Sequence, residues 1–150
     1  MNILELKKDL LSACLKEVDD RADSLRKVME DAQQSANDYG QPKDRYDSYR
    51  TQLLRKRDMF GQQLQKILEQ RALLEKMGVD KRHEVAGYGA LVITNAQKIF
   101  ISIGLGKFEF NGNEYFVISP VVPYFKAIEG KRAGEDFEFR GQKFRIKDIA

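Results

Sequence analysis

The side chains best suited to chemistry in this sequence are four aspartates that cluster near the middle of its first half. They lie in or beside a short turn-forming stretch, and they are Asp31, Asp38, Asp44 and Asp47. Protein-bound Mg²⁺ takes one or two carboxylates and keeps its other positions for water and phosphate. Two of these side chains could therefore share a divalent cation. The alternative role is structural, because aspartates in turns cap helices and compensate the positive end of the helix dipole.

Two segments with a seven-residue repeat must position these aspartates. The apolar repeats are Leu4, Leu11, Val18, Leu25 and Ala32, then Tyr46, Leu53, Phe60, Ile67 and Leu74. Folding the chain about residue 39 pairs them, from Leu4 with Leu74 to Ala32 with Tyr46. Residues 37–42 read Asn-Asp-Tyr-Gly-Gln-Pro, which is strong turn chemistry. The pattern predicts helices over 2–36 and 42–77 in a long antiparallel coiled-coil hairpin, with arms of about 50 Å and a polar tip.

The second half changes to the period-two alternation of strands. Strands are predicted over 85–94, 97–104, 108–110, 114–119, 135–139 and 143–149. Asn111-Gly112 and Arg140-Gly141 are pairs typical of two-residue hairpin turns, and 123–129 has the composition of a two-turn helix. We therefore predict an α+β fold, with a helical hairpin in 1–79 followed by a small sheet domain in 80–150.

Composition narrows the possible functions. The 150 residues include one cysteine, Cys14, and one histidine, His83, so a cysteine-based metal site or a Cys–His nucleophile is not indicated. His83 is interpreted as a linker residue, and the lone Gly-x-Gly fragments at 87–89 and 104–106 lack the context of a dinucleotide site. No apolar run resembles a signal peptide or a membrane span, which predicts a cytoplasmic protein without membrane contact. The net charge of +3 and the scattered basic residues indicate DNA binding only weakly.

Residues 118–136 carry the most specific motif of the chain. They read Ile-Ser-Pro-Val-Val-Pro-Tyr-Phe-Lys-Ala-Ile-Glu-Gly-Lys-Arg-Ala-Gly-Glu-Asp. With the preceding helical hairpin, this stretch resembles the bacterial Gre-type transcription elongation factors, which stimulate transcript cleavage. That family has a Ser-Pro, a small-residue helix ending in Leu-x-Gly-Lys, and then Gly-Asp before a final hairpin. Pro123, Gly130, Lys131 and Gly134 fall at matching spacings. The resemblance covers the whole chain in architecture but only this stretch in motif.

The resemblance implies a specific partner and role. Gre-type factors bind RNA polymerase at the mouth of its secondary channel through a C-terminal domain that is FKBP-like in fold, and the hairpin enters the channel. The residues expected at or near the docking surface are Ser119, Pro120, Pro123, Tyr124 and Phe125. Acidic tip residues help to hold the second Mg²⁺ of the polymerase, which activates water to cut backtracked RNA. The chain would stimulate the polymerase rather than act as an enzyme, would bind no cofactor tightly, and could also contact nascent RNA.

The tip departs from the family pattern. The family has Asp-x-x-Glu followed by Asn-Ala-Glu-Tyr, whereas here no glutamate follows Asp38 by three residues. Lys43 and Arg45 stand where the family has Asn and Glu, and Tyr46 is retained. Asp38 and Asp44 are therefore the pair predicted to replace the family's catalytic and metal-binding acids.

Three other functions remain open from the sequence. The chain could be a channel-binding regulator that does not stimulate cleavage, because the acidic pair is altered. It could be a coiled-coil adaptor unrelated to polymerase, which apolar residues at the tip would favour. It could also be a prolyl isomerase, which an aromatic-lined pocket in the sheet domain would favour.

Overall fold

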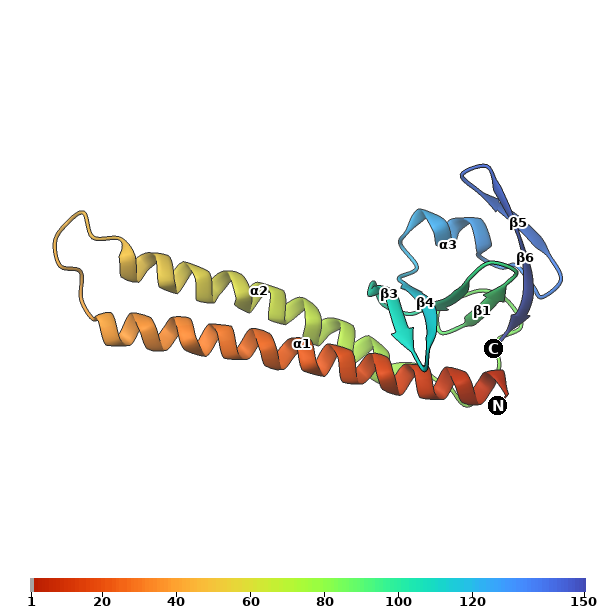
Figure 1. Ribbon diagram of the computed structural model, residues 1–150, viewed down its shortest axis with the longest axis horizontal. Coiled ribbons are helices and arrows are strands. Elements are labelled where there is room, and N and C mark those ends of the chain that lie inside the picture. The colour runs from red at the N-terminus through yellow and green to blue at the C-terminus, as the bar shows by residue number, and fades with distance from the viewer. Residues whose placement is uncertain (1) are drawn as a thin grey trace. The chain divides into compact units, whose positions relative to one another are not determined.

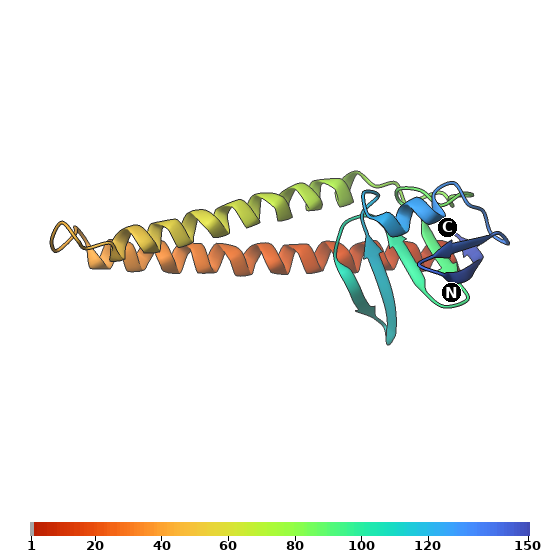
Figure 2. The same cartoon turned by 90° about the horizontal axis from the view of Figure 1, so that it is seen from above.

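Two long helices joined by a loop make up most of the first half of the chain (Figure 1). In the computed structural model, which describes residues 2–150, α1 spans Ile3–Tyr39 and α2 spans Tyr49–Lys76. The two helices run antiparallel, as both views of the ribbon show (Figure 2). The predicted start of the second helix near residue 42 is wrong, because residues 40–48 form a loop. Aspartate side chains in this loop bond to backbone amides, which offers the backbone an alternative to helix.

Side-chain contacts between α1 and α2 define a register that differs from the predicted one. A Cβ added to Gly61 would lie 3.3 Å from Met29 Cε. Two arginines of α2 donate to side chains of α1, in the pairs Arg57–Gln33 and Arg71–Asp19. All three pairs are symmetric about residue 45 rather than residue 39. The predicted pairing of Ala32 with Tyr46 is consequently wrong, and Tyr46 lies in the loop with 77% of its surface exposed.

Backbone contacts group the chain into two units. One unit holds the start of α1, up to Cys14, together with Leu73–Ala150, and the other is Leu15–Ala72. The first unit thus combines the sheet with an end of each helix. The domain boundary at 79/80 that the sequence pattern suggests stays a prediction.

The sheet unit confirms the α+β fold class. Its strands are β1 Leu91–Thr94, β2 Lys98–Ile101, β3 Gly106–Phe110, β4 Asn113–Ile118, β5 Asp136–Phe139 and β6 Gln142–Ile149. They form one sheet in the order β3-β4-β2-β1-β6-β5, in which only β2 and β4 are parallel neighbours. The strand predicted over 85–94 is shorter than expected, because Gly89 turns the backbone with a φ of +91° just before β1.

The predicted hairpin turns are confirmed by their backbone angles. Asn111 and Gly112 have φ values of +50° and +78°, and Arg140 and Gly141 have +52° and +79°. Two consecutive positive φ values are the signature of a type I′ turn, whose twist matches that of the flanking strands. These turns fix the registers of the β3–β4 and β5–β6 hairpins.

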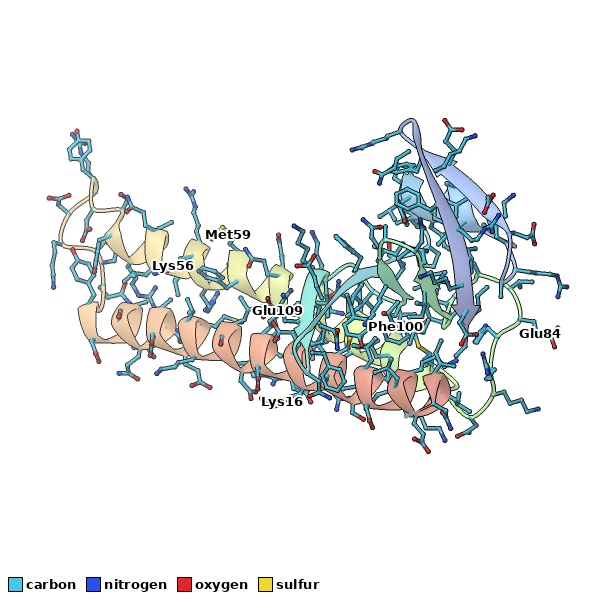
Figure 3. All side chains as sticks on the ribbon, turned by 45° about the vertical axis from the view of Figure 1, so that its right-hand side comes forward. Lys16, Lys56, Met59, Glu84, Phe100 and Glu109 are labelled. Carbon is cyan, nitrogen blue, oxygen red and sulfur yellow. The ribbon has the colours of Figure 1, made fainter. Side chains whose placement is uncertain are left out.

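The core of the sheet unit lies on both faces of the sheet. On one face, α3, Pro123–Ile128, packs with Phe125 and Ile128 against apolar side chains that include Val92 and Ile146. On the other face Phe100, labelled in Figure 3, is fully buried. Within residues 2–150, no helix combines the length and the apolar character needed to cross a membrane.

Candidate functional site

The loop between α1 and α2 begins where a glycine stops the first helix. Gly40 adopts a φ of +80°, and its amide donates to the Ala36 carbonyl oxygen at 3.1 Å. Such a left-handed glycine is a common way to end a helix and to turn the chain away from its axis. Pro42 follows in the loop and does not start α2. The loop that holds the predicted site residues therefore spans 40–48.

Asp47 organises this loop. Its Oδ2 accepts hydrogen bonds from the Tyr39 hydroxyl at 2.5 Å and from the Lys43 amide at 2.7 Å. Its Oδ1 accepts from the Tyr49 amide at 3.1 Å, where α2 begins. The Tyr39 hydroxyl, and next the Lys43 amide, hold the pKa of Asp47 below its usual range. The same bond to Asp47 raises the pKa of Tyr39 to about 12. Asp47 thus performs the capping role that the sequence left open.

Asp38 and Asp44, the predicted acidic pair, are both exposed, and each keeps one carboxylate oxygen available. Asp38 Oδ1 accepts from Gln34 Nε2 at 2.8 Å, and Asp44 Oδ1 accepts from the Tyr46 amide at 2.8 Å. In the part of the chain that the structure describes, neither Oδ2 has a hydrogen-bond partner, and no bond joins the two side chains. Asp31 is exposed further back on α1.

Across residues 2–150 there is no group of three His, Cys, Asp or Glu side chains that could hold a metal ion. Asp38 and Asp44 together offer two exposed carboxylates. They could complete the coordination shell of a metal ion whose other ligands come from another molecule.

Cations and aromatic rings accompany the carboxylates at the tip. The Lys43 ammonium lies 4.9 Å from the centroid of the Tyr39 ring, and the Arg45 guanidinium lies 4.7 Å from that of Tyr46. Arg45 also donates to the Tyr46 hydroxyl at 2.6 Å. The sequence interpretation missed the exposure of Tyr46 because it placed this residue on the helical seam. The closely spaced Asp44 and Asp47, which favour turns, were the signal against a helix there.

The expected docking segment lies between β4 and the end of α3. Ser119 and Pro120 are half-buried and Pro123 is exposed, whereas Phe125 is a core residue with 5% exposure. Tyr124 is half-buried, and its hydroxyl donates to Gln97 Oε1 at 2.9 Å. Burial raises the pKa of Tyr124 to about 12. The most exposed apolar side chain of the segment is Val121, at 83%, which the sequence interpretation did not single out.

The single histidine, His83, and the single cysteine, Cys14, both pack among other residues of the fold. The His83 ring lies against Gly89, where an added Cβ would be 3.2 Å from Nε2. Burial, and then the nearby Lys7, lower the pKa of His83. Cys14 is fully buried. Neither belongs to a metal-binding group among the described residues.

No family model matches this chain. No curated protein matches it either. Among solved structures, it is similar to GreA factor homolog 1 (Gfh1) of Thermus thermophilus, with 18% sequence identity over 95% of this chain and 93% of that one. The TM-score of this match is 0.36.

Proposed function

We propose that this chain is a transcription elongation factor that binds RNA polymerase at its secondary channel and presents the α1–α2 loop to the active site. The observation that carries the proposal is the pair of exposed carboxylates, Asp38 and Asp44, at the turn of an antiparallel helical hairpin. The Gre-like motif over 118–136 supports the same role. The docking contacts proposed for the sheet unit are Ser119, Pro120, Pro123, Tyr124 and Phe125. Phe125 is a core residue, and its role in docking is to hold the neighbouring residues of the segment in position.

Within this proposal, Asp38 and Asp44 stimulate the cleavage of backtracked RNA by the polymerase. Each side chain has one free carboxylate oxygen to coordinate Mg²⁺, and the polymerase would supply the other ligands. The ion would therefore be held jointly and weakly. The hydrolytic reaction belongs to the polymerase, and the chain is not an enzyme by itself. Nascent RNA would then lie within reach of the tip.

The decisive experiment uses backtracked elongation complexes of the cognate polymerase, with and without the protein. Shortened 3′ RNA products are expected with the wild-type chain and should be lost in Asp38→Asn and Asp44→Asn. Asp31→Asn is the matched control, because it removes an exposed carboxylate of α1 outside the loop and should leave cleavage unchanged. Unaltered cleavage in both loop variants would contradict the assigned roles.

A non-cleaving regulator is the second candidate, and the cations at the tip favour it. Lys43 and Arg45 place positive charge beside the aspartates, where two-metal chemistry needs negative charge. A protein of this kind would yield no shortened RNA and would compete with a cleavage factor for polymerase. Absence of both cleavage and competition would instead favour a coiled-coil adaptor, for which the exposed Tyr46 ring is the supporting feature.

The prolyl isomerase alternative has one feature in its favour, since Tyr124 lines an aromatic cavity in the sheet unit. Measuring the cis-to-trans rate of a short Xaa-Pro peptide tests it. A rate equal to that in buffer would remove this alternative.

A further inference from the structure

The sheet unit contains a cavity of about 300 Å³ with mainly apolar walls. Phe116 and Ile118 of β4 form part of it, Tyr124 of α3 another part, and Phe139 and Phe144 of the β5–β6 hairpin the rest. This volume is at the lower end of the range of about 300–1,000 Å³ found for ligand sites. It therefore suits one large side chain and the adjoining backbone.

The aromatic wall is held in place by its own packing. The Tyr124 ring contacts Phe139 and Phe144 edge-on, with centroid distances of 5.0 and 6.2 Å. Phe144 stacks on Phe137 at 5.1 Å, and the two are directly opposed in the β5–β6 ladder. The hydrogen bond from Tyr124 to Gln97 fixes the ring further. A pocket that is already formed pays less ordering entropy when a ligand binds.

The rim of this pocket supplies positive charge and hydrogen-bond donors. Arg140 lies at the tip of the β5–β6 turn, with its guanidinium 5.1 Å from the Phe139 ring centroid. Gln97 uses Oε1 to accept from Tyr124, which leaves its Nε2 to donate. Gln142 is exposed beside them. Within residues 2–150, neither Arg140 nor Gln142 has a side-chain hydrogen bond, and no carboxylate lines the cavity.

We propose that this pocket binds a protein segment in which a large apolar side chain is followed by an acidic residue. The apolar side chain fills the aromatic cavity, and the carboxylate pairs with Arg140, whose planar guanidinium suits bidentate recognition. The donors of Gln97 and Gln142 meet the backbone carbonyls of the segment. The inference rests on the proposed function for the identity of the partner. Because Tyr124 belongs to the proposed docking segment, the bound segment would be part of RNA polymerase.

Peptide binding to the full-length chain tests the pocket without polymerase. The probes are three blocked peptides that differ at two central positions, which are Phe-Glu, Phe-Lys and Ala-Glu. At roughly millimolar peptide, NMR should show shifts of the Gln97 and Gln142 side-chain amides with Phe-Glu. We expect Phe-Lys and Ala-Glu to bind at least about tenfold more weakly, equivalent to 1.4 kcal/mol. Equal binding of all three peptides, or no shift with Phe-Glu, would overturn the proposal.

Charge reversal at the rim gives the matched variants. Arg140→Glu should abolish the preference for Phe-Glu and favour Phe-Lys. Lys143→Glu is the control, because Lys143 pairs with Glu138 in the ladder and does not line the cavity. An unchanged preference in Arg140→Glu would contradict the proposal even if the peptides bind.

Polymerase binding by the same variants separates this inference from the proposed function. If the wild-type chain binds polymerase and Arg140→Glu binds equally well, the pocket proposal fails while the function stands. If the chain does not bind polymerase but discriminates between the peptides, the function fails and the pocket proposal stands.

Discussion

The hydroxyl of Tyr39, the last residue of α1, donates to the carboxylate of Asp47 across the loop at 2.5 Å. Asp47 in turn accepts from the first amide of α2. One ionised side chain therefore links the end of the first helix to the start of the second. The conformation in which Asp38 and Asp44 are presented depends on this link, because both lie within or beside the loop that it closes.

Tyr39→Phe should move the pKa of Asp47 up toward its usual value, measured by NMR titration of the carboxyl. The shift should be partial, because the Lys43 and Tyr49 amides still favour the charged form. Since the folded-state pKa is lowered, this carboxylate stabilises the fold above its ordinary pKa of 3.8, and the contribution is lost as pH falls through the folded value. Tyr49→Phe is the control, and an identical Asp47 titration in Tyr39→Phe would contradict the link.

The helix register predicts which residues can be cross-linked. With Cys14 replaced by Ala, a Met29→Cys/Gly61→Cys pair should be bridged by a short bifunctional thiol reagent, because a Cβ at position 61 would lie 3.3 Å from the end of the Met29 side chain. Leu25→Cys/Leu53→Cys, a pair symmetric about residue 39, should not be bridged. Gel mobility after proteolysis distinguishes the two. The opposite result would restore the register that the heptad pattern suggested.

Gly141→Ala should lower the free energy of unfolding by about 1 kcal/mol, because residue 141 has a φ of +79°. Urea unfolding measures the change. Gly104→Ala is the matched control, since a Cβ at Gly104 would meet open space and its φ is not in the left-handed region. That control should be neutral or slightly stabilising, by about 0.5 kcal/mol. Equal effects of the two substitutions would argue against the type I′ turn.

Lys7→Met should change how stability depends on pH. Lys7 is fully buried and its ammonium donates to the Lys81 carbonyl oxygen at 3.2 Å. Burial, and then Arg82, lower its pKa from 10.5, so the folded state loses this proton before the unfolded state does. The contribution of Lys7 to stability should therefore rise with pH between the lowered pKa and 10.5, so the wild type should gain stability relative to Lys7→Met across that range. Urea unfolding at several alkaline pH values measures it.

Lys8→Met provides the comparison for this prediction, because Lys8 is exposed on the same helix. It should keep the wild-type dependence on pH. A difference in stability between the wild type and Lys7→Met that does not change with pH in the alkaline range would show that Lys7 is solvated.

Local chemistry explains which elements were predictable. Arg140-Gly141 and Asn111-Gly112 specify their turns within two residues, and Pro123 with Gly130 brackets the short helix α3. The candidate acids Asp38 and Asp44 were found from their position beside a turn. The docking segment stays a prediction from the resemblance, and the core position of Phe125 was not visible from the motif.

The sequence by itself determined the two long helices, the strand-rich second half and the two type I′ turns, because each depends on contacts between near neighbours in the chain. Tertiary structure decided the register of α1 against α2, since a heptad repeat defines the buried face of a helix but not which turns meet. It also decided the pocket around Tyr124, whose walls come from β4, α3 and the β5–β6 hairpin. Only the pairing of strands distant in sequence brings those side chains together.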